Sequence, residues 1–227
     1  MTLDVFAIAY NEAFMLPHFI KHYQSAPFNA NITIFDNFST DNSKEIIIEK
    51  GCNYKTFDTG GQIRDDLYLS IKNEAFKTSK AQWVINVDID ELLEIDFPLD
   101  LYNVIRTQGY DMIGAPPSRL GVSNNMYSKM CMFRPDAVFQ VGYNIGCHSA
   151  NPTFRVPPIV SPISAKLLHY KYISEDFLYQ RHLVYQSRLS EINKTYNWGS
   201  DYMNVEKEKI NKKFEELRAK ATLIPTN

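Results

Sequence analysis

The first half of the chain alternates between short apolar runs and segments whose apolar residues recur at helical spacing. The apolar runs are rich in β-branched and aromatic residues, which predicts buried strands at residues 3–10, 31–35, 54–57 and 82–87. Between them, apolar residues three and four positions apart predict amphipathic helices over about residues 12–24, 42–50 and 63–76. Four strands separated by three helices predict βαβ units, a parallel sheet and helices on both of its faces.

The second half has a different pattern, in which prolines separate short β-like pieces. These pieces lie at residues 112–115, 126–133 and 137–141, so mixed or antiparallel strands and long loops are expected over about residues 109–172. Two helices are expected at the end of the chain, over residues 176–192 and 203–219. The predicted fold class is therefore α/β: a Rossmann-related three-layer sandwich with a mainly parallel central sheet and a smaller mixed-strand part.

Composition narrows the class of protein without giving its chemistry. The 227 residues are 44% hydrophobic, enough for one large core, and the net charge of −2 argues against a nucleic-acid partner. No apolar run is long enough to span a membrane, and the N-terminus lacks the basic region of a secretory signal. Cys52, Cys131 and Cys147 are scattered, which fits a reducing compartment. We expect a cytoplasmic protein, or one peripheral at the inner membrane face.

The segment Val87-Asp88-Ile89-Asp90-Glu91 directly follows the fourth predicted strand. In extended chain Asp88 and Asp90 point the same way. Two carboxylates about 4 Å apart repel by about 4 kcal/mol at an effective dielectric near 20, and a hard cation such as Mg²⁺ or Mn²⁺ relieves that repulsion. The alternative is a solvated acidic turn that caps the next helix. The position at the end of a parallel strand favours a metal that holds a diphosphate.

Other strand ends add residues suited to a nucleotide, because ligands of open parallel sheets bind beyond the carboxyl ends of the strands. Tyr10-Asn11-Glu12 ends the first strand, where an aromatic ring could stack on a nucleobase. Asp36 ends the second, where acids accept hydrogen bonds from a ribose or a base. The sequence has no GxGxxG after the first strand and no GxxxxGK[ST], so the phosphate charge falls to the metal or to Arg64.

In order and spacing, these residues resemble family-2-like glycosyltransferases of the GT-A fold, in particular their short bacterial and viral branch with a DxDE motif. The resemblance covers about residues 4–95, and more thinly residues 129–135 and 168–172. The matching blocks are Ala9-Tyr10-Asn11-Glu12, Leu16-Pro17-x-Phe19-Ile20-Lys21-His22-Tyr23, Phe35-Asp36-Asn37-x-Ser39-Thr40-Asp41, Gln62-x-Arg64 and Trp83-x-x-Asn86-x-Asp88-x-Asp90-Glu91-Leu92.

The resemblance implies a metal-dependent enzyme with Mn²⁺ or Mg²⁺ as cofactor. It would move a sugar from a UDP- or dTDP-type donor to the hydroxyl of a glycan, lipid-linked or protein acceptor, with inversion favoured, in glycan or surface polysaccharide synthesis. The whole chain, residues 1–227, would form one GT-A domain with a nucleotide-sugar half at 1–97. Residues 98–227 would form the acceptor half, including the C-terminal helices.

The resemblance also implies roles for individual residues. Tyr10 and Asp36 would hold the nucleobase, and the adjoining Asn11 and Glu12 would belong to the donor site. Arg64 would contact the base or the phosphates, and Asp88 would bind the ribose. Asp90 and His169 would be the ligands of the metal. Taken without the resemblance, His169 is better explained as a buried core histidine.

An inverting transfer needs a carboxylate base close to the acceptor hydroxyl, and the family's usual downstream acidic motif is not evident. Asp136 and Glu91 are the candidates, and each could instead be a turn acid or a helix cap. His148 could line an acceptor pocket or be structural, and Trp198 could offer a face to a sugar.

Two other functions use the same residues. A metal-dependent phosphatase or nucleotidyltransferase could employ the carboxylate pair, although phosphatases place a D-x-D nucleophile after the first strand instead of the fourth. A non-catalytic carbohydrate-binding protein on the same fold would fit the lack of an obvious base.

Overall fold

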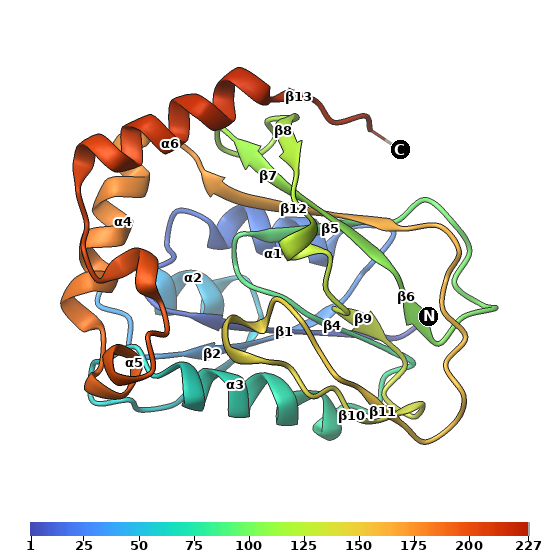
Figure 1. Cartoon of the computed structure of the whole chain (residues 1–227). Helices are drawn as coiled ribbons and strands as arrows, with labels where there is room; N and C mark the ends of the chain where they lie inside the picture. The colour runs from blue at the N-terminus through green and yellow to red at the C-terminus, as the bar shows by residue number, and fades with distance from the viewer. Residues whose placement is uncertain (227) are drawn as a thin grey trace.

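The largest sheet of the computed structural model, which describes residues 1–226, has six strands in the order β3-β2-β1-β4-β9-β6 (Figure 1). Its four parallel strands are β1 (Leu3–Ala9), β2 (Asn31–Asp36), β3 (Asn53–Thr56) and β4 (Trp83–Asn86). Two short strands complete the sheet. β9 (Met132–Phe133) pairs antiparallel with β4, and β6 (Val104–Ile105) pairs antiparallel with β9. The predicted parallel sheet is confirmed, and each of its strands lies within one residue of the expected bounds.

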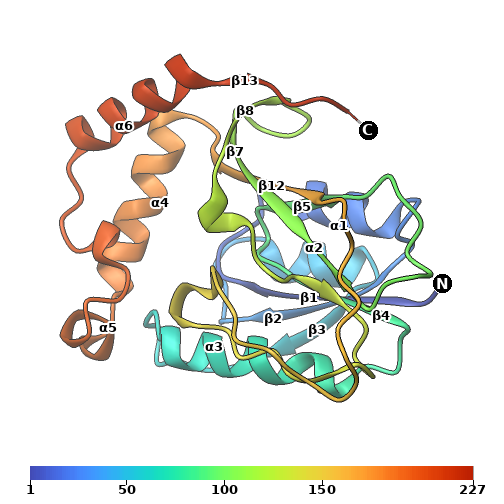
Figure 2. The same ribbon diagram turned by 45° about the vertical axis from the view of Figure 1, so that its right-hand side comes forward.

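Helices cover both faces of this sheet. α1 (Leu16–Gln24) and α2 (Ser43–Glu49) lie on one face, and α3 (Asp65–Glu74) lies on the other (Figure 2). A 3₁₀ turn at Ala75–Thr78 extends α3. α1 begins later than the expected residue 12 because Pro17 stands in its first turn, the one part of a helix that does not need its missing N–H. The predicted three layers are present.

A second sheet of five strands, in the order β13-β8-β7-β12-β5, occupies the other half. Its strands are β5 (Glu91–Glu94), β7 (Thr107–Ile113), β8 (Leu120–Ser123), β12 (Ala165–Tyr172) and β13 (Thr222–Leu223). β12 pairs antiparallel with β5 and parallel with β7, so the expected mixed strands are confirmed. A small hairpin joins β10 (Val138–Gln140) to β11 (Thr153–Phe154).

Three helices lie near the end of the chain: α4 (Glu175–Arg188), α5 (Glu191–Thr195) and α6 (Lys207–Lys220). α4 and α6 stand beside the second sheet, whereas α5 lies near the start of α3 (Figure 1). The predicted helix 176–192 was wrong in its extent, because the Ser190 hydroxyl caps a new helix by accepting from the Asn193 N–H. The expected strand 126–133 was also wrong in part, because its start is a 3₁₀ turn at Asn125–Tyr127 capped by Asn124.

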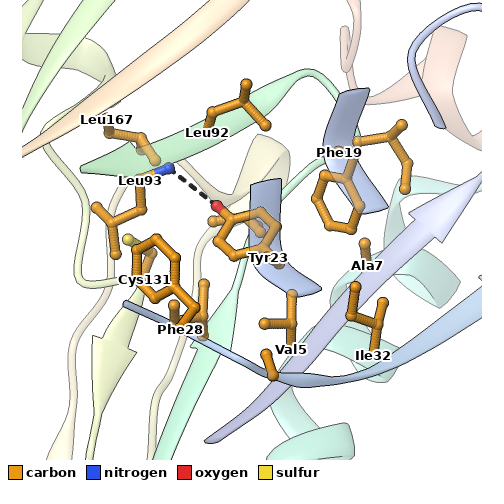
Figure 3. Packing of buried hydrophobic residues seen from close by; sticks show 14 of the residues in the cluster. Val5, Ala7, Phe19, Tyr23, Phe28, Ile32, Leu92, Leu93, Cys131 and Leu167 are labelled. Atoms are coloured by element: carbon orange, nitrogen blue, oxygen red, sulfur yellow. Dashed lines mark hydrogen bonds between the residues drawn. The ribbon is translucent and has the colours of Figure 1, made fainter. Parts of the chain in front are cut away.

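The core joins the two sheets beneath the segment that carries Asp88 and Asp90. Tyr23 of α1 is fully buried, and its hydroxyl donates to the carbonyl of Glu91 and accepts from the N–H of Leu93, both at 3.0 Å (Figure 3). Because both partners belong to β5, this one hydroxyl fixes the strand that continues from the carboxylate pair. Within residues 1–226, no helix combines the length and apolar character needed to cross a membrane.

We predict that Tyr23→Phe lowers the free energy of unfolding by about 1–3 kcal/mol, because a buried N–H and a buried carbonyl each lose their partner. Urea denaturation measures this change. Tyr102→Phe is the matched control: among the described residues its hydroxyl has no hydrogen-bond partner, so we expect a change within about 0.5 kcal/mol. Equal losses in the two variants would contradict the role given to the Tyr23 hydroxyl.

Candidate functional site

A cavity of about 580 Å³ opens at the carboxyl ends of β1 and β4. Side chains of α3, α4, β12 and the segment 197–202 complete its walls. This is the end of a parallel sheet at which ligands are expected. The structure brings seven of the residues considered from the sequence to this cavity, namely Tyr10, Glu12, Asp88, Asp90, His148, His169 and Trp198.

Asp90 and His169 face each other across the cavity floor. The Nε2 atom of His169 lies 3.6 Å from Oδ2 of Asp90, and both side chains are nearly buried. The other ring nitrogen, Nδ1, donates to Oδ1 of Asp111 at 3.0 Å. A carboxylate in this place commonly fixes the orientation of a metal-binding histidine, since it leaves the second nitrogen directed at the metal. Asp111 lies inside β7, and no motif in the sequence indicated it.

This donor set fits a divalent metal with a small number of protein ligands. Mg²⁺ and Mn²⁺ accept carboxylate oxygen and imidazole nitrogen, and Mg²⁺ is usually held by one or two side chains together with substrate phosphates and water. In the part of the chain that the structure describes, no group of three or more His, Cys, Asp or Glu side chains is placed to hold a metal. Asp90 and His169 would therefore be the two protein ligands.

The charges at the cavity floor hold both groups ionised. Burial by itself would raise the pKa of the Asp90 carboxyl, but Arg181 and His169 outweigh it and hold this pKa well below its usual range. Burial would likewise lower the pKa of His169, but the charge of Asp90 and the hydrogen bond to Asp111 raise it to about 9. The imidazole is therefore protonated near neutral pH, and a metal has to displace that proton.

Asp88 is held by two buried lysines. Lys72 of α3 forms an ion pair with Oδ1, and Nζ of Lys129 lies 3.5 Å from Oδ2. These cations outweigh the effect of burial and hold the pKa of Asp88 well below its ordinary value. The carboxylate remains partly exposed to the cavity, so its ionised oxygens are available to hydroxyl donors. Lys72 belonged to no motif recognised in the sequence, and Lys129, the first residue of the thinly matching stretch 129–135, had been given no role.

The two predicted catalytic bases lie elsewhere. Glu91 is completely buried, pairs with Lys129 at 2.8 Å and accepts from the backbone N–H of Asp88 at 2.8 Å. Asp136 is exposed and pairs with Arg134 at 3.0 Å. Neither side chain lines the cavity. Glu91 supports the Asp88 loop, and the geometry offers no support for either carboxylate as a base.

Three residues predicted to bind the donor lie outside the cavity lining. The carboxylate of Asp36 accepts from the N–H of Ser39 and the hydroxyl of Tyr54, at 3.1 and 3.0 Å. Oδ1 of Asn11 accepts from the N–H of Thr40 at 2.7 Å, which ties the first strand end to the second. Arg64 is engaged by both carboxylate oxygens of Asp66, at 2.8 and 2.7 Å. In the structure these side chains organise the strand-end loops, and their contact with a nucleotide stays a prediction.

Tyr10 carries a partner that the sequence did not indicate. The guanidinium of Arg188, at the end of α4, lies 3.1 Å from the centre of the Tyr10 ring. It is held there by bonds to Oδ1 of Asn37, at 2.6 Å, and to the carbonyl of Gly61, at 2.9 Å. Arg188 and Tyr10 both line the cavity and form a stacked planar pair. A nucleobase at this end would meet that pair instead of an uncovered tyrosine ring.

Glu12 and Arg181 close the site from the α4 side. Nη2 of Arg181 donates to Oε1 of Glu12 at 2.7 Å, and Nη1 lies 3.2 Å from Oδ2 of Asp90. Burial raises the pKa of Glu12 to about 7, although the charge of Arg181 opposes the rise. Arg181 was also missed, because a single arginine within a helical pattern carries no local signal.

No protein-family model and no curated protein matches the chain. Among solved structures, it is similar to S. aureus TarS 1-349, with 16% identity and a TM-score of 0.44 over 90% of this chain and 71% of that one. The structure of S. aureus TarS 1-349 in complex with UDP-GlcNAc is 15% identical to this chain, with a TM-score of 0.42 over 90% of this chain and 72% of that one.

A third similar structure is glucosyl-3-phosphoglycerate synthase from Mycobacterium tuberculosis in complex with Mn²⁺, UDP and glucosyl-3-phosphoglycerate. It is 14% identical, with a TM-score of 0.33 over 48% of this chain and 44% of that one. At these identities and TM-scores, the function of the chain has to be argued from its own side chains.

We predict that His169 stabilises the metal-free protein most strongly at low pH. Its pKa rises from 6.5 to about 9 on folding, so the stabilisation is complete below about pH 6.5 and is lost as the pH rises through 9. A shift of that size corresponds to on the order of 3 kcal/mol. Urea denaturation in EDTA should therefore show that His169→Gln costs more at pH 6 than at pH 9.5.

His182→Gln is the control for this measurement. His182, which lies in α4, is buried as His169 is. Burial lowers its pKa to about 4, so the folded protein holds it neutral at both pH values. Because the unfolded histidine takes up a proton below its ordinary pKa of 6.5 and the folded one does not, we expect His182→Gln to cost slightly less at pH 6 than at pH 9.5, the opposite of His169→Gln. A cost of His169→Gln that is no larger at pH 6 than at pH 9.5 would show that folding does not raise the pKa of this imidazole.

Proposed function

We propose that the protein is a metal-dependent, family-2-like glycosyltransferase of the GT-A fold. It would transfer a sugar from a UDP- or dTDP-type donor to an acceptor hydroxyl. The observation that carries this proposal is the meeting of Asp90 with His169, which is itself oriented by Asp111, beside Asp88 at the carboxyl end of a parallel strand. This arrangement suits a nucleoside diphosphate whose phosphates complete the coordination of a divalent ion.

The bound metal would act as a Lewis acid that stabilises the diphosphate leaving group. Asp90 and His169 would hold it, and Asp111 would keep the Nε2 atom of His169 directed at it. Asp88, ionised between Lys72 and Lys129, would accept hydrogen bonds from the ribose hydroxyls. These two lysines would also lower the cost of bringing phosphate charge to the cavity.

Planar groups in the cavity lining suit the other parts of the substrates. The Tyr10–Arg188 pair would stack with the nucleobase. Trp198 also lines the cavity and stacks on Tyr196, with ring centres 5.0 Å apart and planes inclined by 20°. Such a platform suits the apolar face of a sugar in a glycan or lipid-linked acceptor. An inverting transfer within glycan or surface polysaccharide synthesis is the form of the reaction that we propose.

A thermal-shift screen of nucleoside diphosphates with and without Mn²⁺ tests the donor class. A ligand at a hundredfold excess over its dissociation constant stabilises the folded state by about 2.7 kcal/mol. We expect stabilisation by UDP or dTDP that requires the metal. Release of phosphate from a phosphomonoester without nucleotide binding would instead favour a phosphatase, and sugar binding without nucleotide binding would favour a carbohydrate-binding protein.

We predict that Asp90→Asn reduces metal-dependent turnover of the nucleotide sugar by more than about a hundredfold, because even residues that only orient metal ligands contribute about 10- to 100-fold. Asp136→Asn is the matched control. That carboxylate is exposed and outside the cavity, so turnover should stay within about twofold of the wild type. Unchanged turnover in Asp90→Asn would overturn the proposed function, and a large loss in Asp136→Asn would restore that residue as the base.

A further inference from the structure

Arg181 lines the cavity and forms ion pairs with both Glu12 and Asp90. Its Nε donates to the hydroxyl of Tyr185 at 2.8 Å, and its Nη2 donates to Oε1 of Glu12 at 2.7 Å. These two bonds fix the plane of the guanidinium and leave Nη1 at the front. The side chain is mostly buried, so the charge is held in place and is not a solvated surface group.

The remaining nitrogen of this guanidinium, Nη1, lies beside the carboxylate oxygen of Asp90 that a metal would have to bind. Nη1 lies 3.2 Å from Oδ2 of Asp90, the same oxygen that faces Nε2 of His169 at 3.6 Å. Nη1 is buried, and across residues 1–226 no acceptor meets it with hydrogen-bond geometry. A buried donor that is charged and without a hydrogen bond is costly. Because Arg181 lines the cavity, an acceptor could reach this nitrogen from there once Asp90 turns toward a metal.

A bare divalent cation and a diphosphate differ in how they meet this charge. A cation that binds Asp90 and His169 alone is repelled by the arginine and competes with it for Oδ2 of Asp90. A diphosphate brings several negative charges and terminal oxygens that accept from a guanidinium in a bidentate or single contact. With the diphosphate present, both the metal and the arginine have a partner, and Nη1 gains the acceptor that it lacks.

We infer that Arg181 is a built-in counter-ion that weakens the binding of a bare divalent cation and transfers its contact to the donor diphosphate. Metal and nucleotide then bind as one unit. This inference rests on the proposed function, because it takes the Asp90–His169 pair as the metal site and a nucleoside diphosphate as the ligand. Arg181 thereby couples the two binding events, and such coupling is reciprocal by thermodynamic necessity.

The test measures two affinities in the same variants. Free Mn²⁺ is followed by electron paramagnetic resonance without nucleotide, and UDP binding is measured by calorimetry at saturating Mn²⁺. We expect Arg181→Gln to bind Mn²⁺ alone about tenfold more tightly than the wild type and UDP about tenfold more weakly. Opposite changes are the signature of the inference, because a residue that only supports the structure would weaken both affinities.

Two further variants separate charge from folding. Arg181→Lys keeps the positive charge, so its Mn²⁺ affinity without nucleotide should stay within about threefold of the wild type. The double variant Glu12→Gln with Arg181→Gln removes both members of the ion pair, which avoids an unpaired buried carboxylate and any new metal ligand at Glu12. It should bind Mn²⁺ alone as tightly as Arg181→Gln. If neither variant lacking the arginine binds Mn²⁺ more tightly than the wild type, the inference is wrong.

A last comparison distinguishes failure of the inference from failure of the proposed function. Asp90→Asn added to Arg181→Gln should remove the gain in Mn²⁺ affinity. If the gain survives, the metal is bound elsewhere, and both the metal site and the inference fall. If Asp90→Asn alone abolishes metal-dependent UDP binding while Arg181→Gln behaves like the wild type, the metal site stands and only the role of Arg181 is overturned.

Discussion

Five carboxylates converge on the end of β4, and the need to balance their charge shapes this part of the molecule. Four of them, Glu12, Asp90, Glu91 and Asp111, are buried, and the fifth, Asp88, is partly exposed to the cavity. Each has a cationic partner, and the four partners come from four places along the chain: Lys72, Lys129, His169 and Arg181. Because buried charges of one sign repel strongly unless they are paired, the cluster can form only when all these segments are in place.

The backbone brings the segments together through one antiparallel pairing. β12 pairs with β5 so that His169 lies opposite Glu91, directly after the Asp88–Asp90 turn. β7 lies parallel on the other side of β12 with Asp111 beside His169. The hydroxyl of Tyr23 then anchors β5 to α1, the first helix packed on the main sheet. Ion pairs at the site and packing of the core therefore depend on the same short strand.

The site is divided between the parallel sheet, which supplies acids, and α4, which supplies arginines. Arg181 reaches Asp90 and Glu12, and Arg188 covers Tyr10. The backbone of the same helix end is tied to the start of α3, since the carbonyl of Arg188 accepts from the N–H of Ile63 at 2.6 Å. A ligand bound in the cavity would therefore contact both the strand ends of the main sheet and α4.

The sequence by itself determined the parallel sheet, its helices and the place of the acidic pair, because these depend on local periodicity and on a strand followed directly by Asp88 and Asp90. The thinner resemblance at residues 168–172 also singled out His169, which the structure places beside Asp90. Only the tertiary structure decided which acids reach the cavity: Glu91 is buried beneath it, Asp136 lies outside it, and Asp36 is taken up by its own loop. The role of each lysine or arginine could not be predicted, because such a side chain has no local signal, whether it lies in a helix, as Lys72 and Arg181 do, or in a connecting segment, as Lys129 does. Its role is set by the long-range contacts that bring it to a buried carboxylate.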